Sequence, residues 1–60
     1  MFNNLPREPM LCLSVVNTKL RDQYKDIDSL CEDLNVDKAL LIERLAQIDY
    51  EYDAVRNQFV

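Results

Sequence analysis

Apolar side chains recur at helical spacing over the first third of the chain. Beyond Pro6 and Pro9, one side of a helix would carry Met10, Leu13, Val16, Leu20 and Tyr24. Side chains three and four positions apart share a helix face, so this pattern predicts a helix over about residues 9–23. Pro9 suits the first helical position, where its missing N–H would have no intrahelical partner in any case. Residues 1–8 are expected to form an extended arm, because a proline disfavours helix in the residue before it.

A second, shorter apolar stripe follows a connection at residues 24–26. Its members fall at i, i+3, i+4 and i+7 and are Ile27, Leu30, Cys31 and Leu34. The stripe predicts a helix over residues 27–34. Asp26 is the expected N-cap, because its carboxylate accepts hydrogen bonds from the free N–H groups of the first turn. Asn35 is expected to end this helix, since asparagine tolerates the left-handed conformation found just past helix ends.

A third helix is predicted over residues 37–48. Asp37 is its expected N-cap, and Val36 is placed to pack on Leu41 as a hydrophobic staple. The face expected to be buried carries Leu41, Leu45 and Ile48, widened by Leu40 and Ile42. With the helix before it and the tight turn between them, this helix has the pattern of a helix-turn-helix.

The periodicity changes from helical to alternating near the C-terminus. Apolar residues alternate there with acidic ones, in the order Ile48, Asp49, Tyr50, Glu51, Tyr52 and Asp53. Alternation predicts a strand with one wet face, paired with residues 58–60 in a hairpin over about residues 50–60. Its loop would occupy residues 53–57, where Asn57 can accept positive φ. The alternative, in which the third helix continues through Val55, stays open at this point.

The predicted fold is mainly α, a single small domain over residues 1–60. It has three helices in a helix-turn-helix-like arrangement and a short C-terminal β-hairpin. A chain of 60 residues has a small core, and self-association is one source of additional burial.

The first helix carries more apolar surface than one face requires, because Leu11, Cys12 and Val15 lie outside its main stripe. A helix that is apolar on more than one face is buried on more than one face. We therefore expect a homo-oligomer, most simply a dimer, or another protein partner. Asn17 is a weak helix former in mid-helix, and its side chain is expected to face solvent, to satisfy a backbone group of the arm or hairpin, or to fix the register of a partner helix. The candidate interaction surface is Met10, Leu11, Val15 and Asn17.

Charge is distributed unevenly around a net value of −4. Basic residues outnumber acidic ones over the first 25 positions, whereas between Asp26 and Asp53 the carboxylates face only Lys38 and Arg44. An acidic surface repels phosphate backbones and acidic lipids and suits a basic protein surface. The longest apolar stretch, residues 10–16, is far shorter than the roughly 20 residues needed to cross a bilayer. The N-terminus lacks the pattern of a secretory signal. We expect a cytoplasmic protein without membrane contact.

The sequence contains few residues that could act in catalysis or bind a metal ion. The chain has no histidine and no glycine, so it lacks the usual general base and the usual phosphate-binding loop. Cys12 and Cys31 cannot complete a zinc site, and both occupy positions of small core residues. We expect neither an enzyme nor a cofactor.

Nucleic-acid binding through the helix-turn-helix is the alternative function. It requires basic or amide side chains on the second helix of the pair. Here Lys38 and Arg44 would compete with nearby carboxylates, so we do not expect it.

Five blocks of sequence, which together span nearly the whole chain, resemble a known family. They are Leu5-Pro6 with Pro9, residues 16–22 (Val-Asn-Thr-Lys-Leu-Arg-Asp), residues 30–34 (Leu-Cys-Glu-Asp-Leu), residues 48–53 (Ile-Asp-Tyr-Glu-Tyr-Asp) and residues 57–60 (Asn-Gln-Phe-Val). The chain is similar in these blocks to family 4250 of domains of unknown function. The resemblance implies a complete bacterial protein of about this length. It implies no activity, so no functional residues are carried over.

Overall fold

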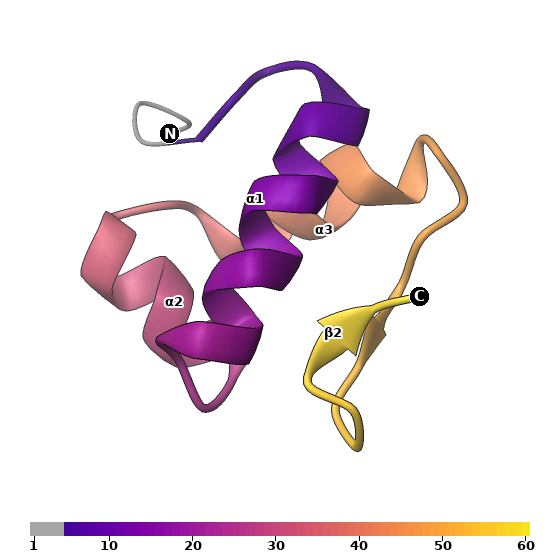
Figure 1. Cartoon of the computed structure of the whole chain (residues 1–60). Helices are drawn as coiled ribbons and strands as arrows, with labels where there is room; N and C mark the ends of the chain where they lie inside the picture. Colours follow the sequence, from indigo (N-terminus) through magenta and orange to yellow (C-terminus); the bar gives the residue numbers. More distant parts are fainter. Residues whose placement is uncertain (1–4) are drawn as a thin grey trace.

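The computed structural model describes residues 5–60, which form three helices followed by a hairpin (Figure 1). In chain order the elements are α1 (Pro9–Asp22), α2 (Ile27–Leu34), α3 (Lys38–Ala46), β1 (Tyr52–Asp53) and β2 (Gln58–Phe59). The two strands pair antiparallel, with Tyr52 opposite Phe59. The predicted mainly α fold with a C-terminal hairpin is confirmed. The alternative helix through Val55 is wrong. Of the predicted arm, residues 1–4 lie outside the described part, and residues 5–8 lead into α1 without regular secondary structure.

α1 is the central element, in contact with α2, α3 and β2. Figure 1 shows α1 crossing in front of α3, with α2 on one side and the hairpin on the other. The core between these elements contains Leu5, Cys12, Leu13, Val16, Leu20, Ile27, Leu30, Cys31, Val36, Leu41, Leu45 and Phe59. Because α1 has neighbours on three sides, only its front remains open to solvent.

Local capping signals explain where the helices begin. The Asp26 carboxylate accepts the backbone N–H of Ser29 at 2.8 Å, and the Asp37 carboxylate accepts those of Ala39 and Leu40. α1 is capped instead by Glu8, whose carboxylate accepts the Leu11 N–H at 2.8 Å. Capping by glutamate was not anticipated, because shorter polar side chains are the preferred N-caps.

α3 ends at Ala46 rather than at residue 48, the predicted end. The backbone of Asp49 is left-handed, with φ 65°. This conformation lets the Tyr50 N–H donate to the Leu45 carbonyl and the Asp49 N–H to the Ala46 carbonyl. These two bonds form a Schellman motif, which satisfies the last carbonyls and turns the chain out of the helix. Asn35 ends α2 in the same way, with φ 56° as predicted.

Hydrogen bonds from the side chains of two asparagines, Asn17 and Asn57, hold the hairpin against α1. The Asn17 amide donates to the Phe59 carbonyl at 3.1 Å and accepts the Phe59 N–H at 2.8 Å. In the hairpin loop, Asn57 has the predicted positive φ of 54°. Its amide donates to the carbonyls of Leu20 and Tyr24, at 3.0 and 2.9 Å, near the end of α1. These bonds hold the hairpin against α1, where Phe59 closes the core.

Three apolar residues expected on buried faces are exposed instead. Met10 does not continue the buried stripe of α1, and Leu40 and Ile42 do not widen the buried face of α3. The reason is geometric, since each helix buries only the stripe that faces its neighbours. In α3 that stripe consists of Leu41 and Leu45.

Candidate interaction surface

The first two turns of α1 present two large apolar side chains to solvent. Met10 is 52% exposed and Leu11 is 60% exposed, while Val15, one turn further on, is half-buried against the core. Ser14 and Thr18 follow on the exposed side and are polar. We call Met10, Leu11 and Val15 the α1 patch. It is confined to the N-terminal half of the helix.

Cys12, predicted to belong to the additional apolar surface of α1, is instead fully buried in the core. One copy of the chain therefore covers Cys12 without help. Of the three residues outside the main stripe, Leu11 stays exposed and Val15 half-buried, and Met10, predicted for the buried stripe, is exposed beside them.

Asn17, the fourth residue predicted for the surface, is not part of the α1 patch. Its amide is half-buried and is used within the chain by the two hydrogen bonds to Phe59. Of the possibilities predicted for Asn17, which were solvent, a backbone group of the arm or hairpin, and a partner helix, the structure shows a backbone group of the hairpin. Asn17 therefore positions β2.

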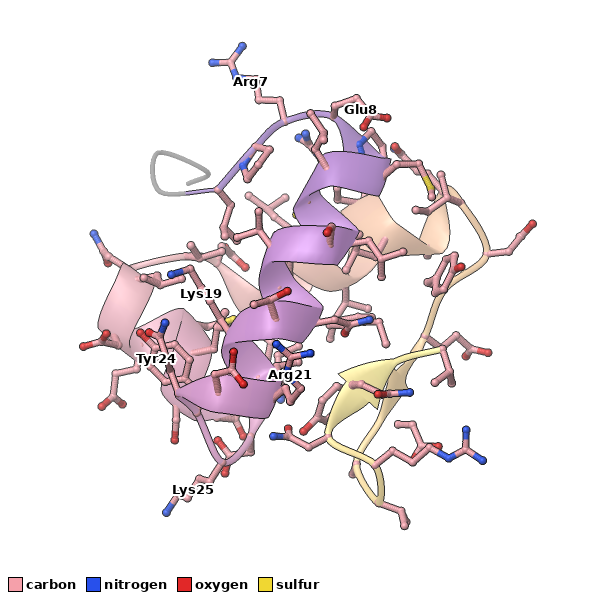
Figure 2. All side chains as sticks on the ribbon, viewed as in Figure 1. Arg7, Glu8, Lys19, Arg21, Tyr24 and Lys25 are labelled. Carbon is pink, nitrogen blue, oxygen red and sulfur yellow. The ribbon has the colours of Figure 1, made fainter. Side chains whose placement is uncertain are left out.

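The chain segment that leads into the α1 patch is held against α3. Leu5 is buried in the core, and the Arg44 guanidinium of α3 donates to the Arg7 backbone carbonyl. Figure 2 shows the Arg7 side chain itself pointing away from the molecule at this end of α1. The Arg7 guanidinium, three positions before Met10, is exposed and forms no ion pair with another residue in 5–60.

α3 carries a second exposed apolar stripe, which the sequence pattern did not predict. Ala39, Ile42 and Ala46 stand at i, i+3 and i+7 on one side of the helix, and all three are exposed, Ile42 to 38%. We call these three residues the α3 stripe. The spacing was visible in the sequence, but Ile42 was assigned to the buried face beside Leu41. Periodicity alone could not show which of the two adjacent stripes faces the core.

A cavity of about 340 Å³ opens where α3 ends, lined by Ala46, Asp49, Tyr50 and Glu51. Tyr50 is half-buried, and both carboxylates are exposed. No cation within residues 5–60 forms an ion pair with Asp49 or Glu51. Two carboxylates beside an aromatic ring suit a cationic group, which the carboxylates attract and the ring face accepts.

The two cysteines are free thiols and belong to the core. Burial raises the pKa of the Cys12 thiol, and the charge of Arg44 opposes this only in part. Burial likewise raises the pKa of the Cys31 thiol. Both groups are protonated at neutral pH, and a thiol is a poor nucleophile and metal ligand compared with a thiolate.

Neither a metal centre nor a membrane span is found within the described residues. Residues 5–60 contain no group of three or more His, Cys, Asp or Glu side chains that could hold a metal ion. None of the helices there is long and apolar enough to pass through a bilayer.

The order of a helix-turn-helix is present in α2, the turn after it and α3. However, both basic residues of α3 already interact with other groups of the chain. The Lys38 ammonium forms a 2.8 Å ion pair with Asp28 of α2, which raises the pKa of Lys38. Arg44 is turned toward the Arg7 carbonyl. What α3 shows to solvent is mainly apolar or acidic, which is a poor surface for phosphate contacts.

Comparison with known proteins identifies the family. Residues 6–59 match a family described as Domain of unknown function (DUF4250). The chain belongs to this family. No curated protein and no solved structure shows a significant match to the chain.

Proposed function

We propose that this DUF4250 domain is a non-catalytic, self-associating interaction module of the cytoplasm, which forms a homodimer through the α1 patch. The observation that carries the proposal is the exposure of Met10 and Leu11, at 52% and 60%, at consecutive positions in the first turn of α1. Large neighbouring apolar side chains on a small surface favour contact with another protein.

The position of the α1 patch also supports the proposal. The Glu8 cap and the Arg44 bond to the Arg7 carbonyl fix the first turn of α1. A surface that is ordered before binding loses less conformational entropy when it binds. Two copies are the simplest assembly, because most soluble oligomers are symmetric homodimers.

No specific observation favours the alternative of nucleic-acid binding. Its test remains simple, since binding to phosphates weakens as salt rises. Retention on a polyanion column at low salt, lost at high salt, would revive that alternative.

Sedimentation velocity of Leu11→Asp tests the proposed function. The change places a carboxylate in the α1 patch, and it should leave the fold intact because Leu11 is exposed. We expect the unaltered chain to sediment faster as its concentration rises and Leu11→Asp to remain a monomer. Val55→Asp is the matched control, because Val55 is 96% exposed at the far tip of the hairpin. If Leu11→Asp associated as strongly as Val55→Asp, the α1 patch would not be the interface.

A further inference from the structure

The hairpin has one paired edge and one open edge. Glu51 and Val60 exchange both of their backbone hydrogen bonds, at 2.9 and 2.8 Å. Tyr52 and Phe59, the next pair along, therefore point their backbone groups away from each other, as alternate pairs do in an antiparallel ladder. On the β2 side, the Phe59 groups meet the Asn17 amide. The Tyr52 groups point out of the opposite edge, which belongs to β1.

The open edge presents three backbone groups, which we call the β1 edge. Two of them are the N–H and the C=O of Tyr52. The third is the C=O of Tyr50, because a trans peptide directs this carbonyl opposite to the Glu51 N–H, which points to β2. None of the three forms a hydrogen bond with another residue in 5–60. The sheet contains only β1 and β2 within this part of the chain, so a third strand has backbone partners on the β1 side.

Carboxylates accompany the β1 edge. Side chains alternate along a strand, so Glu51 and Asp53 project from the outer face of the hairpin, while Tyr52 packs against the core. Glu51 is exposed and forms no ion pair with a residue in 5–60. The Asp53 carboxylate is used within the hairpin loop, where it accepts the N–H groups of Val55 and Arg56. Glu51 is therefore the carboxylate at this edge that a partner meets first.

Negative charge outweighs positive charge around the β1 edge. Residues 47–60 contain three acidic side chains and one basic side chain, Arg56, which contacts Asp53 at 3.9 Å. The other two carboxylates, Asp49 and Glu51, line the cavity at the end of α3, and no basic side chain lines it with them. The surface that borders the β1 edge therefore attracts cations.

A second copy of β1 is a poor partner for this edge. If two β1 strands paired antiparallel with Tyr52 at the centre, each Glu51 would lie opposite Asp53 of the other copy. Like charges directly opposite each other destabilise a strand pair, and charged side chains are one means by which proteins keep exposed edges apart. A strand that carries basic side chains replaces this repulsion by attraction.

We propose that the β1 edge binds an extended basic segment of a partner protein, which adds a third strand to the hairpin. The residue opposite Tyr52 forms two backbone hydrogen bonds, and its side chain lies on the same face as that of Tyr52. The side chains before and after it lie on the outer face, one of them beside Glu51 and the cavity. The segment therefore has Lys or Arg at alternate positions, with residues such as Val or Thr between them. This inference does not rest on the proposed self-association, which uses the α1 patch.

Two peptides with blocked ends test the backbone part of the inference. The first is Thr-Lys-Val-Lys-Val-Lys-Thr, and the second has the same sequence with both valines N-methylated. Methylation removes the N–H groups that would meet β1 and leaves the charge unchanged. In a titration followed by NMR, the first peptide should shift the backbone amide signal of Tyr52. The methylated peptide should bind about tenfold more weakly or worse, because the Tyr52 carbonyl loses its donor.

Variants of the chain test the charge part. Glu51→Lys should weaken binding of the first peptide about tenfold or more, because an ammonium then faces the lysines. Glu32→Lys is the matched control, since it makes the same charge change on the exposed side of α2, away from the hairpin (Figure 1). It should bind within about threefold of the unaltered chain. Leu11→Asp, which changes the α1 patch, should also bind the peptide as the unaltered chain does.

The outcomes separate this inference from the proposed function. If the methylated peptide binds as well as the first, or if Glu51→Lys behaves like Glu32→Lys, strand pairing on β1 is overturned. If the first peptide leaves the Tyr52 signal unchanged, the carboxylates only keep other strands away, and the inference is again overturned. A chain that binds the peptide but stays a monomer at every concentration would overturn the proposed function and support this inference.

Discussion

At the scale of single residues, the Asn17 side chain makes the two backbone hydrogen bonds to Phe59 that a neighbouring strand would otherwise make. Its amide gives Phe59 one donor and one acceptor, as the backbone of a neighbouring strand would. The outer edge of β2 is thereby paired rather than left open at this position. An asparagine in mid-helix is a poor choice for helix propensity, and its contact with β2 offsets that cost.

Asn17→Ala should lower the free energy of unfolding by about 1–3 kcal/mol, because it leaves the Phe59 N–H and carbonyl without their partner. Urea unfolding measures the change. Thr18→Ala is the control, since Thr18 is exposed and its change should stay within about 0.5 kcal/mol. Equal stability of the two variants would show that the Asn17 bonds contribute nothing.

Asn57 combines a backbone role with a side-chain role, and two substitutions separate them. Asn57→Gly keeps the positive φ but removes the bonds to Leu20, Tyr24 and the Tyr52 hydroxyl. It should cost about 1–3 kcal/mol in the free energy of unfolding. Asn57→Ala should cost about 1–2 kcal/mol more, because alanine resists the left-handed conformation. If the two variants unfold at the same urea concentration, the backbone at position 57 carries no such penalty.

At the scale of elements, the cap of α2 makes stability depend on pH. The hydrogen bonds that Asp26 accepts at Ser29 hold the pKa of its carboxyl below the usual range. A carboxyl whose pKa is lower in the folded chain stabilises the fold above its unfolded pKa of about 3.9. That stabilisation is lost as the pH falls further, through the folded pKa.

Asp26→Asn should therefore flatten part of the acid-induced loss of stability below about pH 4, because asparagine still caps the helix but does not titrate. Thermal melting at a series of pH values measures it. Asp26→Ala serves as the comparison, since it removes the cap and should melt at a lower temperature throughout. An Asp26→Asn chain with the same pH profile as the unaltered chain would contradict the role of this cap.

Sequence patterns predict elements best where the signal is local. Asp26, Asn35 and Asp37 act on backbone groups within five residues, so the boundaries at α2 and the start of α3 could be predicted. The end of α3 was set two residues too late, because the left-handed backbone of Asp49 has no clear sequence signal. Contacts such as Asn57 with Leu20, 37 positions apart, depend on the packed fold and could not be predicted.

The candidate site was predicted only in part for a related reason. Leu11 and Met10 are exposed, but Asn17 is turned inward by β2, whose position the sequence does not reveal. The α3 stripe was missed because Ile42 lies close to the buried stripe of Leu41 and Leu45 in the helical pattern. An apolar helical residue at the edge of a buried stripe can lie on either side of the boundary.

At the scale of the whole molecule, a single copy of the chain already forms a buried hydrophobic core. The Cα radius of gyration is 10.0 Å, close to the roughly 10 Å expected for a folded chain of this length. The proposed self-association is therefore not needed to complete the core, and it would use surface that remains exposed in one copy. Variants of the α1 patch should consequently change assembly while leaving the structure of the monomer intact.

The most direct measurement is a dilution series followed by NMR chemical shifts of the unaltered chain. The account predicts that shifts change with concentration at Met10, Leu11 and Val15, while those at the hairpin tip around Val55 stay constant. If no shift depended on concentration, or if the changes were confined to the hairpin tip, the claim that the α1 patch mediates self-association would be contradicted.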